Sequence, residues 1–242
     1  AAAKTLASSG DVRRRIEACL ANDSLERLPA ERALCLEFGC ARETVRSVLS
    51  RMEGEGLIYR KQRSGWYPSP APMTYHVNRV AGFNDRAELS GRIAETVALS
   101  VTSIAASTLT DDVLCPFVVD GPVEWLWRID RVRSLDGMAV HSETVYLDGR
   151  LPGIDHWQLD RSITQLLKRE FGIRVASERL HITAMSLPDE HCRRIGASLG
   201  TPGLFIVRHR FDESGRLIEL DHEFWRAGSI ELVLDESDLA KP

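Results

Sequence analysis

The stretch LPAERALCLEFGCARETVRSVLSRMEGEGLIYRKQRSGWY, residues 28–67, decides the fold of the N-terminal part of the chain. Pro29 suits the first turn of a helix, where a missing N–H costs nothing, and Gly39 suits its end. A further helix is predicted over residues 42–55, because its apolar residues recur at helical spacing. Residues 57–67 then predict a small hairpin. Upstream, one more amphipathic helix is predicted from the stripe Val12, Ile16, Cys19 and Leu20.

The predicted third helix turns two arginines outward near its N-terminal end. Arg42 and Arg46 are one turn apart, so their guanidinium groups can reach base edges or phosphates when the helix end enters a major groove. Arg32 and Arg63 can reach the flanking DNA backbone, and Gly65 lets the hairpin approach DNA closely. The alternative is an ordinary solvated helix face.

Residues 9–67 resemble the winged helix-turn-helix of the GntR family of transcription regulators. The resemblance is carried by Leu28–Leu34, Arg42–Arg46, Met52–Ile58 and Gly65, which follow the family's order and spacing. It implies operator contacts at Arg32, Arg42, Thr44, Arg46 and Gly65, to which we add Glu43 and Arg63. Glu43 departs from the family, which usually carries Ser or Thr there. Its carboxylate would repel phosphate or accept a hydrogen bond from a cytosine amine.

Charge divides the chain into two unlike parts. The net charge is −4, but residues 1–67 carry 12 basic and 9 acidic side chains, whereas the remainder carries 19 basic and 26 acidic ones. A basic N-terminal part on an acidic body suits a DNA-binding unit attached to a domain that does not bind DNA. The alternative is a chance asymmetry between two ordinary domains.

Composition excludes several other classes of protein. No apolar run is long enough to span a membrane, and the N-terminus lacks the pattern of a signal peptide, so we expect a cytoplasmic protein without membrane contact. The five cysteines are scattered and form no C-x-x-C pair, so neither disulfides nor a metal site is predicted. No motif for a catalytic residue or a cofactor is present.

A proline-rich run at residues 68–75 predicts a linker, so we expect a DNA-binding domain at 1–67 and a second domain at 76–242. The second part is rich in strand patterns, which we place at residues 97–109, 123–134, 138–147, 204–211 and 216–226. Helices are expected at residues 84–95, 162–171 and 188–199. The predicted class is α+β, with an antiparallel sheet behind the N-terminal helices.

Two arginines alternate along the predicted strand over residues 123–134. Arg131 and Arg133 share a face with Trp125 and Trp127, because side chains alternate along a strand. Half-buried guanidinium groups require an anion, and such a pair matches a phosphate, phosphonate or carboxylate. The alternative is a structural pairing with acidic residues of neighbouring strands, such as Glu143 or Glu219.

The string from Trp127 to Tyr146 resembles the central hairpin of the UTRA effector domains in the HutC subfamily, and weaker similarity extends over residues 75–235. The resemblance implies a chorismate-lyase-like α+β fold that dimerises and binds a metabolite. Family contacts carry over to Phe83, Asn84, Arg131, Arg133, Glu143, Ser162, Glu219 and Trp225. Trp225 replaces a commoner tyrosine, so a hydroxyl contact is lost.

These observations predict a homodimeric repressor that binds an inverted-repeat operator in double-stranded DNA and responds to a small anionic effector. Two arginines and the helix start at Ser162 suit a phosphate-like group, while Glu143 and Glu219 suit an ammonium or hydroxyls. We favour an aminophosphonate such as 2-aminoethylphosphonate, then a sugar phosphate, then a carboxylate such as urocanate. A lyase-like enzyme and a constitutive architectural DNA-binding protein are the alternatives from other classes.

Overall fold

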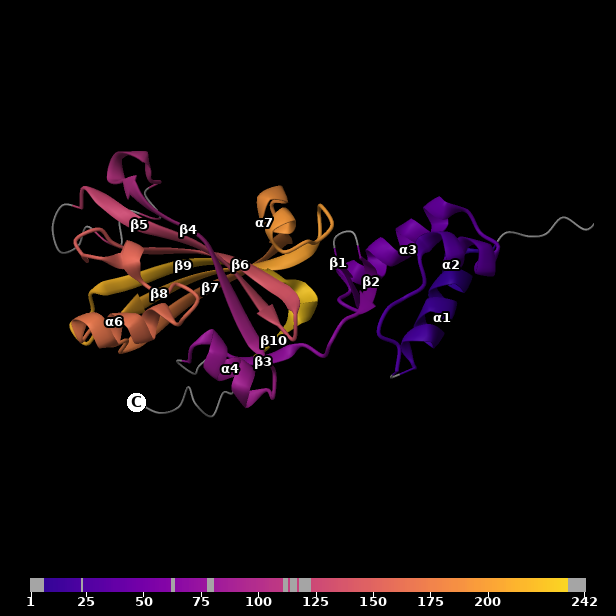
Figure 1. Cartoon of the computed structure of the whole chain (residues 1–242), viewed down its shortest axis with the longest axis horizontal. Helices are drawn as coiled ribbons and strands as arrows, with labels where there is room; N and C mark the ends of the chain where they lie inside the picture. The colour runs from indigo at the N-terminus through magenta and orange to yellow at the C-terminus, as the bar shows by residue number, and fades with distance from the viewer. Residues whose placement is uncertain are drawn as a thin grey trace, which may run out of the picture.

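The computed structural model describes residues 7–22, 24–61, 64–77, 81–110, 113, 117 and 123–234. Figure 1 shows a small helical lobe, built from the first part of the chain, beside a larger lobe around a twisted sheet. We refer to the first lobe as the head and to the second as the sheet domain. The predicted α+β class, with helices ahead of an antiparallel sheet, is confirmed.

The head contains α1 (Ser9–Leu20), α2 (Glu31–Phe38) and α3 (Arg42–Gly54). Gly39 ends α2 in the left-handed conformation, with a φ of 64°. Pro29 lies before the helix and not in its first turn, because Ala30 is extended and serves as the N-cap. The apolar stripes meet in one core made of Val12, Ile16, Leu28, Leu34, Phe38, Val45, Val48, Leu49, Met52, Ile58 and Trp66.

The predicted hairpin follows α3 as β1 (Ile58–Lys61) and β2 (Gly65–Pro68), which pair antiparallel. Trp66 anchors the hairpin in the core of the head. Gly65 has a φ of 111°, a conformation that side chains disfavour. The hairpin tip at Arg63 lies outside the described residues.

The sheet domain is built on six antiparallel strands in the order β4-β5-β6-β9-β8-β7. Two hairpins, β5–β6 and β8–β9, are formed by strands that the sequence predicted, and they lie side by side because β6 pairs with β9. Asp136 and Gly137 both have positive φ, as the tight turn between β5 and β6 requires. The strands are β4 (Ala94–Ala105), β5 (Trp125–Leu135), β6 (Met138–Asp148), β7 (Ser177–Ser186), β8 (Pro202–Phe211) and β9 (Leu217–Arg226).

Helices lie on both faces of this sheet (Figure 1). On one face, α6 (Ile163–Phe171) packs against Ile129 and Val145. On the same face, α4 (Phe83–Leu89) packs near Trp225. The opposite face carries α7 (Asp189–Arg194), whose Cys192 packs with Val132 and Phe224. Even and odd positions of the strands therefore serve two separate cores.

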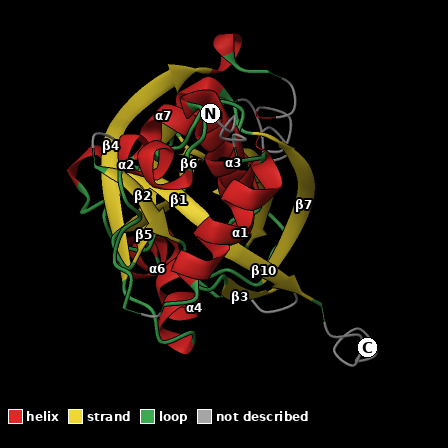
Figure 2. Cartoon of the chain, turned by 90° about the vertical axis from the view of Figure 1, so that its right-hand side faces the viewer, coloured by secondary structure: helices red, strands yellow, loops and turns green. Residues whose placement is uncertain are grey.

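A parallel pair closes the sheet domain beside α4. β3 (Met73–His76) pairs with β10 (Ile230–Val233), and Met73 and Tyr75 are buried in the core of this domain. The two strands run together in Figure 2, which looks at the molecule from the side of the head. The run predicted as a linker thus includes the beginning of β3.

Two predicted helices end earlier than expected, and one strand of the six-stranded sheet was not predicted. The helix expected at residues 84–95 ends at Leu89, because Gly91 turns the chain with a φ of 64° and β4 begins at Ala94. The helix expected to reach residue 199 ends at Arg194, just before Gly196, whose φ is also positive. β7 was not predicted from the sequence, because few of its residues are β-branched.

Across the described part of the chain, no helix is both long and apolar enough to cross a membrane. The same residues contain no group of three His, Cys, Asp or Glu side chains that could hold a metal ion.

Candidate functional site

The outer face of α3 presents the two arginines that the sequence singled out. The side chain of Arg42 is 68% exposed and that of Arg46 is 52% exposed. Glu31 of α2 orients both, with its Oε2 atom 2.9 Å from Arg46 Nε and 3.6 Å from Arg42 Nε. Trp66 Nε1 donates a hydrogen bond of 3.4 Å to the other oxygen of Glu31. The carboxylate of Glu31 on α2 therefore contacts both α3 and β2, the elements that would face DNA.

Burial alone would raise the pKa of Glu31, but hydrogen bonds from Arg46 and Trp66 outweigh it and hold that pKa below its ordinary value. Arg32 and Glu43 are exposed, and Thr44 is half-buried. Arg27, which the sequence argument missed, reaches the hairpin and donates to the carbonyl oxygen of Ser64 at 3.4 Å. Its position between two predicted helices gave no periodic signal.

In the sheet domain, Arg131 and Arg133 converge on one carboxylate. Glu143 Oε1 lies 2.5 Å from Arg131 Nε and 2.9 Å from Arg133 Nε. Arg131 also donates to the carbonyl oxygens of Leu159 and Arg161, at 3.3 and 2.9 Å. Burial would raise the pKa of Glu143, but the two guanidinium groups hold it well below its usual range. Arg131 and Arg133 are thus paired with an acidic residue of the neighbouring strand, as the alternative interpretation of the sequence expected.

A second charged cluster lies on β8 and β9. Its two arginines, Arg208 and Arg210, were not predicted from the sequence as part of a site. Arg208 Nε lies 2.8 Å from Glu223 Oε1, and Arg210 Nη1 lies 2.6 Å from Asp221 Oδ2 and 2.7 Å from Glu219 Oε1. Glu178 of β7 pairs with both arginines, at 2.7 and 3.0 Å. Arginines at alternate positions of one strand, opposite three alternate acids of the next, were the available signal.

The pKa values of two carboxyl groups on β9, Asp221 and Glu223, shift in opposite directions. Burial and the neighbouring Glu219 raise the pKa of Asp221 well above its usual range. Burial opposes ionisation of Glu223 too, but Arg208 and His141 lower its pKa to about 2. Within the described residues, Asp221 Oδ1 is buried without a hydrogen-bond partner. β9 therefore offers two acceptors, the charged carboxylate of Glu223 and the unpaired Oδ1 atom of Asp221.

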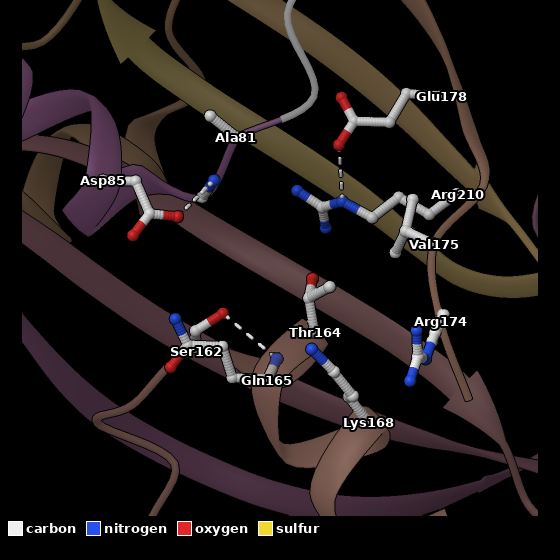
Figure 3. Close-up of a pocket in the computed structure, with 11 residues that line it drawn as sticks. Ala81, Asp85, Ser162, Thr164, Gln165, Lys168, Arg174, Val175, Glu178 and Arg210 are labelled. Atoms are coloured by element: carbon white, nitrogen blue, oxygen red, sulfur yellow. Dashed lines mark hydrogen bonds and ion pairs between the residues drawn. The ribbon is translucent and has the colours of Figure 1, made fainter. Parts of the chain in front are cut away.

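Two adjoining cavities open at these clusters and share Ala81 and Arg210 in their linings. The inner cavity has a volume of about 30 Å³ and is lined by Phe83, Arg133, His141, Glu143, Asp221, Glu223 and Trp225, among others. The outer cavity has a volume of about 280 Å³ and is lined by Ser162, Thr164, Gln165, Lys168, Arg174 and Arg210, among others. In Figure 3, Lys168 of α6 and Arg210 of β8 face this outer space.

The start of α6 forms one wall of the outer cavity. Ser162 is the N-cap, and its hydroxyl oxygen accepts a hydrogen bond of 3.4 Å from the Gln165 backbone N–H. Free N–H groups and the helix dipole at such a terminus favour an anion. Lys168 and Arg174 add two exposed cations, neither of which the sequence argument named.

The eight residues predicted to contact an effector are thus divided. Phe83, Arg133, Glu143 and Trp225 line the inner cavity, and Ser162 lines the outer one. Arg131 and Glu219 line neither cavity; Arg131 is buried against Glu143, and Glu219 accepts a hydrogen bond of 3.2 Å from Thr164 Oγ1. Asn84 is exposed on α4 and also lines neither cavity.

Trp225 and its neighbours form the aromatic side of the inner cavity. Trp225 Nε1 donates a hydrogen bond of 2.7 Å to Glu223 Oε2 on the same strand. The rings of His141 and Phe83 lie 3.9 and 6.1 Å from the indole. The tryptophans of β5, by contrast, line neither cavity.

Comparison with known proteins agrees with this two-part layout. Residues 9–67 match the model of bacterial regulatory proteins of the gntR family, and residues 121–231 match the UTRA domain. The chain is 26% identical over 210 residues to the uncharacterized HTH-type transcriptional regulator YihL of Escherichia coli (strain K12), covering 86% of this chain and 88% of that one.

Two further relatives span both domains. The chain is 24% identical over 212 residues to the probable fructoselysine utilization operon transcriptional repressor of Escherichia coli O157:H7, covering 87% of this chain and 85% of that one. Its fold is similar to the crystal structure of PhnF from Mycobacterium smegmatis, with a TM-score of 0.63 and 22% identity over 93% of this chain and 98% of that chain.

A helix-turn-helix head on a ligand-binding domain defines a ligand-responsive, DNA-binding transcription regulator. The chain belongs to the GntR family, in the HutC-type branch that carries a UTRA domain, as its resemblance indicated.

Proposed function

We propose that this regulator is a homodimeric repressor that binds an inverted-repeat operator and releases or retains it according to a small metabolite in the sheet domain. Residues 1–67 would bind DNA, residues 68–75 would link, and residues 76–242 would bind the effector and dimerise. Arg42 and Arg46 would contact bases, with Arg32, Glu43, Thr44, Arg63 and Gly65 at the flanks. The exposure of both arginines on α3 supports this assignment.

The effector proposal rests on one observation, two adjoining cavities of unlike chemistry. In the outer cavity, the N-terminus of α6 and the cations Lys168, Arg174 and Arg210 suit a phosphonate or phosphate. Its volume of about 280 Å³ matches a small metabolite.

The inner cavity offers acceptors for a cation or hydroxyl group, beside the four arginines that also line it, Arg86, Arg133, Arg208 and Arg210. Glu143 and Glu223 are ionised there, and Asp221 offers an oxygen without a partner among the described residues. A volume of about 30 Å³ holds one group the size of an ammonium. A phosphonate in the outer cavity and an ammonium in the inner one correspond to 2-aminoethylphosphonate. Phe83, Arg133, Ser162 and Trp225 would contact it directly, whereas Arg131 and Glu219 would act through Glu143 and Arg210.

A sugar phosphate is the second candidate. The hydroxyls of a sugar can replace the ammonium at Glu143 and Glu223, and the repressor similar to this chain is named for fructoselysine, a sugar amine. A carboxylate such as urocanate is the third candidate. We expect binding without turnover in each case.

Isothermal titration calorimetry with 2-aminoethylphosphonate, fructose 6-phosphate, urocanate and inorganic phosphate tests the proposal. Lys168→Ala and Arg174→Ala should each weaken binding of the aminophosphonate about tenfold, since each removes one charge-assisted contact. Arg169→Ala is the matched control, because Arg169 also lies on α6 but pairs with Glu170 outside the cavity. If the aminophosphonate binds no better than inorganic phosphate, or if Arg131→Ala leaves its affinity unchanged, the assignment is wrong.

The homodimer is supported by the edge strand β4. Val97 and Leu99 are 57% and 48% exposed on this strand, and an open apolar edge commonly pairs with another chain. Sedimentation equilibrium of the whole chain should give twice the monomer mass of 27.1 kDa. A monomer at micromolar concentration would contradict the dimer and leave the family assignment intact.

A further inference from the structure

The head and the sheet domain meet at a buried charged pair. Glu53 lies near the end of α3, and Arg226 is the last residue of β9. Arg226 Nη1 lies 3.5 Å from Glu53 Oε1, and the two side chains are 7% and 2% exposed. A charged pair removed from water this far is retained only where both partners stay in place. The pair therefore reports on the relative position of the two lobes.

Arg226 is held firmly on its own side of this contact. Its Nε donates to the carbonyl oxygen of Ala139 at 3.0 Å, and its Nη2 donates to that of Ile195 at 2.7 Å. These bonds fix the guanidinium group to β6 and to the segment after α7. Glu53 therefore docks on a rigid cation of the sheet domain, and α3 is oriented by it.

Two glycines bring the backbones together beside the charged pair. A Cβ atom on Gly56 would lie 2.6 Å from Gly228 Cα, and one on Gly228 would lie 2.4 Å from Gly56 Cα. Real Cβ atoms do not approach so closely, so any side chain at either position would separate the lobes. Gly56 also has a φ of 78°, whereas Gly228 does not need a positive φ.

The same strand also lines the inner cavity. Trp225 precedes Arg226 on β9, and neighbouring side chains on a strand point to opposite faces. Trp225 packs on His141 and bonds Glu223 within the cavity, while Arg226 reaches the head on the other side. A displacement of the end of β9 moves both side chains together.

We propose that Glu53, Gly56, Arg226 and Gly228 form a latch that couples the inner cavity directly to the recognition helix, in addition to the covalent linker. The coupling of this latch to an effector rests on the proposed function of the cavity. Glu53 and Arg226 act as positioning residues: they contact neither DNA nor ligand. The recognition arginines lie at the opposite end of α3, so a small rotation at Glu53 displaces them.

Hydrogen exchange on the full chain without ligand tests the latch. Glu53→Gln, a substitution in the head, should raise exchange about tenfold at residues 217–226 of the sheet domain, because Arg226 loses its charged partner. Gly228→Ala should raise exchange in α3 to a similar extent, since its methyl group separates the lobes without removing a charge. Glu55→Gln is the matched control, because Glu55 pairs with Arg13 inside the head.

Unchanged exchange across the lobes in both Glu53→Gln and Gly228→Ala would overturn the latch. If one variant does not fold, the other decides. Titration of 2-aminoethylphosphonate into the wild-type chain separates the two proposals. If the variants change hydrogen exchange in the opposite lobe but the wild-type chain does not bind this compound, the latch is supported and the ligand assignment is wrong.

Discussion

The arginines of the two lobes differ in their exposure and therefore in the kind of anion that can reach them. In the head, Arg42 and Arg46 are more than half exposed and share Glu31, whose side chain is 19% exposed. In the sheet domain, Arg131 and Arg208 are almost completely buried and are held by carboxylates of neighbouring strands. A long polyanion such as DNA can reach only exposed cations, whereas a small ligand can be enclosed.

A cluster of arginines does not by itself mark a ligand contact. Buried guanidinium groups need permanent counter-charges in the free protein, because an unpaired charge in the interior is very costly. Glu143 supplies that counter-charge for two arginines at once. A ligand anion therefore meets the residues at the rim of the cavities first, such as Lys168 and Arg174.

Removal of the counter-charge in the sheet domain should have the largest effect. Glu143→Gln leaves Arg131 and Arg133 buried without their carboxylate, and we expect a loss of about 3 to 5 kcal/mol in the free energy of unfolding. Urea unfolding followed by circular dichroism measures it. Glu95→Gln, on the exposed side of the neighbouring strand β4, is the control and should change stability by less than about 0.5 kcal/mol.

Removal of an exposed arginine in the head should affect binding and leave folding intact. Arg42→Ala and Arg46→Ala should each weaken operator binding by about 1 to 3 kcal/mol if the guanidinium group contacts a base. Fluorescence anisotropy with an operator selected from a random DNA library by the wild-type chain measures the loss. Arg51→Ala, in the last turn of the same helix, is the control. Wild-type footprints from both variants would show that α3 does not read the operator.

The buried acid Asp221 allows a test by pH. Its raised pKa means that the folded protein keeps a proton that the unfolded chain releases near pH 4. This residue therefore contributes most to stability below that pH, and the contribution is lost as pH rises through the raised pKa. Asp221→Asn keeps the acceptor for Arg210 and removes the titration, so its stability relative to wild type should rise between pH 4 and pH 8, as measured by urea unfolding at both pH values. Equal differences at both pH values would contradict the raised pKa.

The smallest effect is expected when the head loses its own carboxylate. Glu31→Gln removes the partner of Arg42 and Arg46, but water solvates both arginines, so stability should fall by less than about 1 kcal/mol. Thermal unfolding of this variant beside Glu143→Gln compares the same substitution in the two lobes. A loss as large as that of Glu143→Gln would remove the distinction between exposed and buried arginine clusters.

Much of the head could be predicted because its signals are local. The apolar stripe of α3 and the stop at Gly39 depend on residues within a few positions of one another. The same local patterns located the strand that carries Arg131 and Arg133. The ends of α4 and α7 were misjudged where a glycine turned the chain earlier than the apolar pattern suggested.

The order of the two domains, the family, and the residue types that share one face of β5 all follow from the amino-acid sequence. The folded structure was needed to show that Arg131 and Arg133 share Glu143, that Arg208 and Arg210 complete the charged cluster, and that Asn84 is exposed and lines neither cavity. It also decided the pairing of β3 with β10 and the contact of Glu53 with Arg226. The physical reason is that periodicity reports which face a side chain takes, whereas strand order and register decide which distant side chain it meets.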